Sequence, residues 1–123
     1  MSLKEYFEKT KGIGILSTAD AQGNVDSAIY NPPEVFDDET IALNMMEKLS
    51  YQNINANPKA CYLFRENCDG FQGKRLYLAK IEDNDETEHV AKVKSLHPEI
   101  FKNNDKKKHQ VVFKVENVRP LTE

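Results

Sequence analysis

Short apolar segments separated by tight turns make up most of this sequence, and their spacing is what most constrains the fold. Residues 13–18 and 25–30 have the composition of strands, and residues 21–24 between them (AQGN) predict a hairpin turn. Further strands are expected at residues 34–36, 41–45, 59–65, 75–82 and 110–118. Such short connections favour antiparallel neighbours, because a parallel pair needs a crossover of about a dozen residues or more. We therefore predict a mainly β protein with short helices, whose six to seven antiparallel strands close into a small barrel.

Three short helices are expected to cover the edges or openings of this barrel. At residues 2–11, apolar side chains recur at helical spacing after Ser2, which can cap the first turn. A second helix ends at Asn57-Pro58. Asp85 and Glu88 form a capping-box pattern before a third, which His97-Pro98 ends or kinks.

The size and charge of the chain exclude several classes of protein. Its 123 residues predict one domain over residues 1–123, and no apolar run reaches the roughly 18–20 residues of a membrane helix. The net charge of −3 disfavours nucleic acid as a partner, and the one basic cluster, residues 106–109, is expected to be a solvated loop. Cys61 and Cys68 lack metal-ligand spacing, and the N-terminus lacks an export signal. We expect free thiols and a cytoplasmic location.

The usual catalytic motifs are missing from the sequence. There is no G-x-S-x-G, G-x-x-x-x-G-K-[ST] or H-E-x-x-H, and no metal site is expected. His89, His97 and His109 are each expected to be surface residues. No acid–base pair stands out, so the catalytic residues stay unknown. If the protein is an enzyme, another group must bring the reactivity.

Residues 40–64 (TIALNMMEKLSYQNINANPKACYLF) contain the most suggestive site. An apolar strand runs into a polar corner at residues 47–53, and a short helix and a second apolar strand follow. Free backbone N–H groups and the helix dipole at such a corner favour an anion, phosphate above all. More ordinary roles are open for several of its residues: Ser50 could cap the helix, Tyr51 could pack, and Met45 and Met46 could fill the core.

Residues 12–24, 35–41 and 53–60 together resemble three segments of the FMN-binding split-barrel family, which includes pyridoxamine 5′-phosphate oxidase and small bacterial FMN-binding proteins. Residues 12–24 (GIGILSTADAQGN) are similar to the opening hairpin of the family, and residues 35–41 (VFDDETI) continue the likeness. Residues 53–60 (NINANPKA) are similar to its Asn-Leu-x-x-Asn-Pro-x-Val pattern. The resemblance runs across most of the chain in order and spacing. It implies a six- to seven-stranded antiparallel split β-barrel.

The resemblance also implies an FMN-binding oxidoreductase or electron-transfer protein that forms a homodimer with the cofactor at the interface. By position, the isoalloxazine ring would be flanked by Ser27, Ala28, Ile29, Tyr30, Asn44, Met45 and Met46. The phosphate and ribityl chain would be held by Lys48, Leu49, Ser50 and Asn53. The family often has lysine where this chain has Ser50, and Lys48, Lys74 or Arg75 could supply that charge.

Two alternatives remain open from the sequence. The barrel could bind another planar cofactor, a haem or a deazaflavin, although haem needs an axial ligand and the histidines lie late in the chain. It could also be a non-catalytic dimeric binding protein whose cofactor site has weakened, which the serine at position 50 would favour. The substrate, the electron donor and the electron acceptor are not indicated by any motif.

Overall fold

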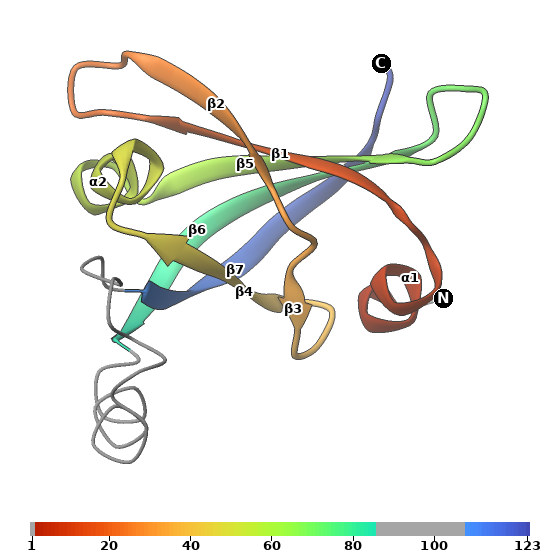
Figure 1. Cartoon of the computed structure of the whole chain (residues 1–123), viewed down its shortest axis with the longest axis horizontal. Helices are drawn as coiled ribbons and strands as arrows, with labels where there is room; N and C mark the ends of the chain where they lie inside the picture. The colour runs from red at the N-terminus through yellow and green to blue at the C-terminus, as the bar shows by residue number, and fades with distance from the viewer. Residues whose placement is uncertain (1, 86–107) are drawn as a thin grey trace, which may run out of the picture.

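The structure, a computed structural model, describes residues 2–85 and 108–123 as one twisted antiparallel sheet with two short helices (Figure 1). The strands are β1 (Gly12–Ala19), β2 (Val25–Tyr30), β3 (Glu34–Val35), β4 (Thr40–Met46), β5 (Lys59–Glu66), β6 (Gly73–Asp85) and β7 (Lys108–Pro120). The helices are α1 (Leu3–Lys9) and α2 (Leu49–Ala56). No helix in the described residues is long and apolar enough to cross a membrane.

All seven strands pair antiparallel in the order β2-β1-β5-β6-β7-β4-β3. The register of β6 against β7 shifts between Tyr77 and Leu78 and again between Lys80 and Glu82. Such irregularities bend a strand and increase its twist, and here they fall in the two longest strands. The sheet therefore curls, and its two edges approach one another across an open side. The predicted fold class, mainly antiparallel β with short helices, is confirmed.

The core lies inside the curled sheet. Along each central strand, alternate side chains point inward, as the period of a strand requires. The largest side chains with less than 2% exposure come from several strands: Tyr62, Phe64, Phe113, Leu16, Ile41, Leu43, Met45, Leu76, Leu78 and Val111, together with Ile54 of α2. The two helices lie at opposite ends of the barrel (Figure 1). Of the two, α2 contacts β1, β2 and β4, and α1 contacts β3.

Most expected elements are present, with two exceptions. The helix expected between Asp85 and Pro98 lies outside the described residues, as do His89 and His97. The basic stretch at residues 106–109 was expected to be a loop, and for its second half this is wrong, because Lys108 and His109 open β7. His109 pairs with Met45 of β4.

Candidate functional site

A cleft of about 480 Å³ opens where the curled sheet fails to close, between the end of β2 and β4. The start of α2 forms its third side. Its wall holds eight of the residues expected at the cofactor: Ala28, Ile29, Tyr30, Asn44, Met46, Lys48, Leu49 and Ser50. The remaining lining residues were not expected: Asn31, Pro32, Glu34, Ala42 and Leu43. They belong to the connection between β2 and β3, to β3 itself and to the strand already implicated, β4, so the cleft extends further along the same part of the chain.

Three expected site residues lie outside the cleft wall. Met45 is fully buried in the core, as the alternation along β4 requires when Met46 faces the cleft. Asn53 is 5% exposed, and its Nδ2 donates to Thr18 Oγ1 at 3.1 Å, which ties α2 to β1. The Ser27 hydroxyl is exposed and pairs with Ser17 at 2.8 Å on the outer face of the sheet.

The corner before α2 has the backbone expected of an anion site. Lys48 N–H donates to the carbonyl of Met46 at 2.7 Å, which closes a three-residue turn around Glu47. Lys48 then serves as the extended N-cap residue of α2, and no side chain caps the helix. The N–H groups of a first helical turn have no intrahelical partner, and the first two residues of α2, Leu49 and Ser50, line the cleft. An exposed lysine stands beside them.

Ser50 has a different role from the capping role left open by the sequence. It is the second residue of α2 and is 4% exposed. Ser50 and Tyr30 both line the cleft, where the start of α2 lies against the end of β2. Burial raises the pKa of Tyr30, and the nearby Ser50 side chain acts in the opposite direction. Tyr30 therefore keeps its proton at neutral pH.

Neither Lys74 nor Arg75 of the same chain supplies a positive charge at the corner before α2. Lys74 Nζ lies 4.8 Å from the ring centroid of Tyr6, and Arg75 Nε donates to the carbonyl of Pro120 at 2.8 Å. Both stand at the start of β6, which pairs with the end of β5, whereas α2 leads into the start of β5. The length of β5 separates the two places by about 20 Å or more.

Tyr62 supports the end of β2 from inside the core. Its side chain is fully buried, and its hydroxyl donates to the carbonyls of Tyr30 and Asn31 at 3.3 and 3.1 Å. Gly14 lies directly against this hydroxyl, and a Cβ there would overlap it. The absence of a side chain at Gly14 thus admits the phenol that fixes one wall of the cleft.

A polar cluster around a buried histidine lies next to the corner, and no sequence pattern indicated it. His109 was expected at the surface, but this is wrong, because it is 5% exposed. Its Nδ1 lies 2.9 Å from Asp83 Oδ1 and its Nε2 lies 2.8 Å from Glu47 Oε1. Tyr51 stacks on the imidazole with the ring centroids 4.3 Å apart, and its hydroxyl donates to Asp83. Burial first, and then the bond to Asp83, raises the pKa of Tyr51.

The sequence does contain a signal for the burial of His109, although not for its partners. His109 precedes Val111, Phe113 and Val115 at intervals of two, which places it on their inward face. Its partners come from β6, from α2 and from the turn before α2, so no local pattern could have named them. In the described part of the chain, no group of three or more His, Cys, Asp or Glu side chains is arranged to hold a metal ion.

Comparisons with known proteins define the fold. Neither a protein-family model nor a curated protein matches the sequence. Among solved structures, an FMN-binding protein from Syntrophomonas wolfei is similar, with a TM-score of 0.71 at 24% identity over 98% of this chain and 84% of that chain. A pyridoxamine 5′-phosphate oxidase-like protein from Lactobacillus delbrueckii gives a TM-score of 0.68 at 18% identity, over 94% and 89%.

A third similar structure is named for a different cofactor. The haem storage protein HutZ from Vibrio cholerae gives a TM-score of 0.57 at 20% identity, over 96% of this chain and 91% of that chain. At these identities the likeness concerns the fold. The chain has the split-barrel fold of the FMN-binding, pyridoxamine 5′-phosphate oxidase-like proteins, and the resemblance found in the sequence is confirmed at that level.

Proposed function

We propose that this protein binds FMN in the cleft between β2 and β4 and acts as a flavin-dependent oxidoreductase or electron-transfer protein. The observation that carries the proposal is the cleft itself, which joins a groove of ligand size to an uncapped helix start with an adjacent lysine. Ligand pockets commonly measure about 300–1,000 Å³, and helix N-termini attract phosphate. The likeness to the Syntrophomonas wolfei FMN-binding protein supports the same cofactor.

The residues present fit the parts of such a ligand. Ala28, Ile29 and Tyr30 form one wall for the isoalloxazine ring, and Asn44 and Met46 form the other. The phosphate and ribityl chain would be held by Lys48, Leu49 and Ser50. Asn53, Met45 and Ser27 act from outside the wall, through core packing and through their hydrogen bonds to β1.

When bound, FMN supplies the electron or hydride chemistry. The residues of the chain orient it and limit its contact with water. Tyr30 is the protonated phenol in the cleft and can donate a hydrogen bond. Glu34, also in the cleft wall, is held by Gln110 Nε2 at 3.0 Å. These contacts make both residues positioning groups, and we assign no catalytic acid or base.

We further propose a homodimer with the cofactor at the interface. The outer face of the β2-β1-β5 region carries an apolar patch, in which Ile15 lies between Ile29 and Leu63 in the register. Val25 and Ile29 are 74% and 71% exposed, an unusual exposure for large apolar side chains along one strand. Ile29 also lines the cleft, so a second copy on this face would reach the ligand. The free thiols of Cys61 and Cys68 suit a cytoplasmic location.

The test is a flavin titration of the purified protein. We expect a yellow protein, or an apo form that binds added FMN with a micromolar or lower Kd. Replacement of both Lys48 and Ser50 by alanine should weaken binding by about tenfold or more, because charge-assisted and hydroxyl contacts to phosphate are lost. The matched control is Lys59→Ala, which removes an exposed lysine paired with Glu116. A protein that neither carries nor takes up FMN would refute the proposal.

The likeness to HutZ makes haem the second candidate. Both ring nitrogens of His109 already face carboxylates at 2.8–2.9 Å, so axial ligation by this histidine would have to break one of these bonds. A Soret band on addition of haem, with no uptake of FMN, would favour this alternative. Saturable binding of a deazaflavin alone would favour that cofactor. If none of the three cofactors saturates the protein, a non-catalytic binding protein is favoured.

A further inference from the structure

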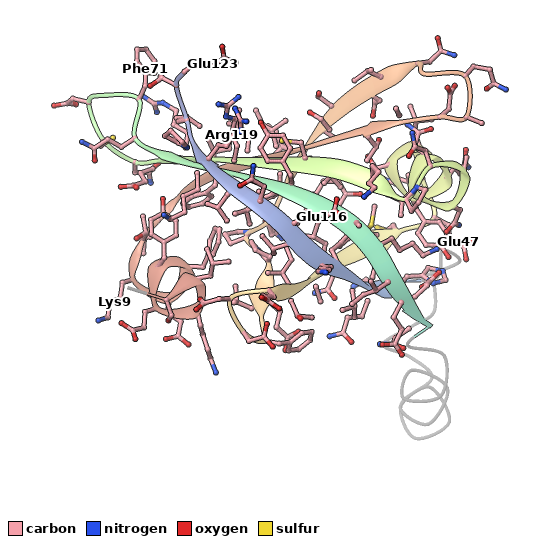
Figure 2. All side chains as sticks on the ribbon, turned by 180° about the vertical axis from the view of Figure 1, so that it is seen from behind. Lys9, Glu47, Phe71, Glu116, Arg119 and Glu123 are labelled. Carbon is pink, nitrogen blue, oxygen red and sulfur yellow. The ribbon has the colours of Figure 1, made fainter. Side chains whose placement is uncertain are left out.

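The cluster of Glu47, Tyr51, Asp83 and His109, which we call the His109 clamp, joins four segments of the fold. Glu47 lies in the turn before α2, Tyr51 in α2, Asp83 in β6 and His109 at the start of β7. Figure 2 shows Glu47 beside the end of β6 and the start of β7. The clamp therefore connects the wall of the barrel with the corner proposed to bind phosphate.

The two carboxylates of the clamp favour a doubly protonated imidazole. Ionised carboxylates only accept hydrogen bonds, so both nitrogens of His109 must donate, one to Asp83 and one to Glu47. The ring then carries both protons and one positive charge. Because the ring is 5% exposed and stacked on Tyr51, water contributes little to holding that charge.

The position of Glu47 connects the charge of His109 with the proposed anion site. Glu47 is the middle residue of the turn that sets Lys48 as the N-cap of α2. Its carboxylate is about half exposed and is held on the barrel side by His109 Nε2 at 2.8 Å. Released from that bond, the same carboxylate would lie free beside Lys48, where it can pair with the lysine and repel a phosphate.

We propose that His109 is a positioning residue for phosphate recognition, which pairs with the carboxylate of Glu47 and holds it away from the anion site at the start of α2. The inference rests on the proposed function, because it takes the phosphomonoester of FMN as the ligand. It predicts that the clamp affects the preference for FMN over riboflavin, which has the same ring system and no phosphate.

The experiment measures the Kd of FMN and of riboflavin for four proteins: the wild type, His109→Gln, Glu47→Gln and the double variant. His109→Gln should reduce the preference for FMN by about tenfold, the scale of one charge-assisted contact, and leave riboflavin nearly unchanged. Glu47→Gln should keep or increase the preference, because no carboxylate remains in the turn before α2 to repel the phosphate. The double variant should recover most of what His109→Gln loses.

This recovery separates positioning from a structural role. If His109 only stabilised the fold, removing a second clamp residue would worsen binding, and riboflavin would suffer as much as FMN. The matched control is Glu66→Gln, which removes a carboxylate bonded to Tyr6 Oη at 2.7 Å at the other end of the barrel. A double variant as weak as His109→Gln, or equal losses for both flavins, would overturn the inference.

Two further measurements keep the inference distinct from the proposed function. The ¹⁵N shifts of the His109 ring at neutral pH should show both nitrogens protonated, and a neutral ring would overturn the inference whatever the cofactor.

If the wild type binds neither flavin, the proposed function fails, and inorganic phosphate becomes the probe. Phosphate should then shift the backbone amides of Leu49 and Ser50 in the wild type and in Glu47→Gln, and less in His109→Gln. No shift in the wild type would overturn the inference.

Discussion

Replacing Tyr62 by phenylalanine removes one hydroxyl from the centre of the fold and tests how the wall of the cleft is held. The hydroxyl donates to the carbonyls of Tyr30 and Asn31, and the side chain is fully buried. A hydrogen bond contributes about 0.5–1.5 kcal/mol net, and a buried acceptor left unpaired costs about 1–3 kcal/mol. We therefore expect Tyr62→Phe to lower the free energy of unfolding by about 1–3 kcal/mol, measured by urea denaturation at pH 7.

The same variant should change how stability depends on alkaline pH. Burial raises the pKa of Tyr62 well above its ordinary value of 10.0. The unfolded chain loses this proton near pH 10 while the folded chain keeps it, so the folded state binds one more proton above about pH 10. Stability from this group is complete below the unfolded-state pKa and is lost as the pH rises toward the folded-state pKa. One such group contributes a slope of about −1.4 kcal/mol per pH unit.

Tyr62→Phe should therefore make the fall in stability between about pH 10 and 11.5 shallower by about 1.4 kcal/mol per pH unit. Ile41→Val is the matched control, since it trims a fully buried side chain and removes no titrating group. It should lower stability by about 0.5–1.5 kcal/mol at every pH and leave the slope unchanged. An unchanged slope in Tyr62→Phe, with normal folding at pH 7, would refute the reasoning.

Three other changes test the local structure. Gly14→Ala should destabilise the fold by several kcal/mol, about 3 or more, because its methyl group overlaps the Tyr62 hydroxyl; a urea midpoint within error of wild type would contradict this. Ser2→Ala should cost about 1 kcal/mol in the same assay, because Ser2 Oγ caps α1, and an equal loss in Ser2→Gly would argue against the cap. Hydrogen bonds, first from the Asn24 side chain, lower the pKa of Asp20 in the folded state. The ionised Asp20 therefore stabilises the fold at pH values above its pKa in the unfolded chain. This stabilisation is lost as the pH falls through its pKa in the folded chain. Asp20→Ala should therefore show a smaller loss of stability than wild type between about pH 5 and pH 3, followed by urea denaturation.

The parts of the fold that depend on neighbouring residues could be predicted from the sequence. The turn at residues 21–24 forms because Asp20 Oδ1 accepts from the N–H groups of Gln22 and Asn24 at 2.9 Å and Gly23 adopts a φ of +85°. The end of α2 before Pro58 follows from the restriction that proline places on the preceding residue. In each case the signal and the structure lie within a few residues of each other.

The polar cluster at His109 could not be predicted in the same way. Its histidine was placed in a basic loop, because Lys108 and the lysines before it dominate the local composition. Its burial depends on the pairing of β7 with β4, which sets His109 opposite Met45. Asp83 and Glu47 reach the ring only once the sheet has curled, so the cluster is a product of long-range pairing.

The serine at position 50 is best understood together with the charges around it. A lysine there would have to extend from a site that is 4% exposed. Serine fits this buried position and leaves the positive charge to Lys48, which is exposed. With only one lysine at the corner, the carboxylate of the adjacent Glu47 would cancel it. In the proposed site, His109 Nε2 pairs with that carboxylate at 2.8 Å, which would leave the charge of Lys48 for a phosphate even without a lysine at position 50.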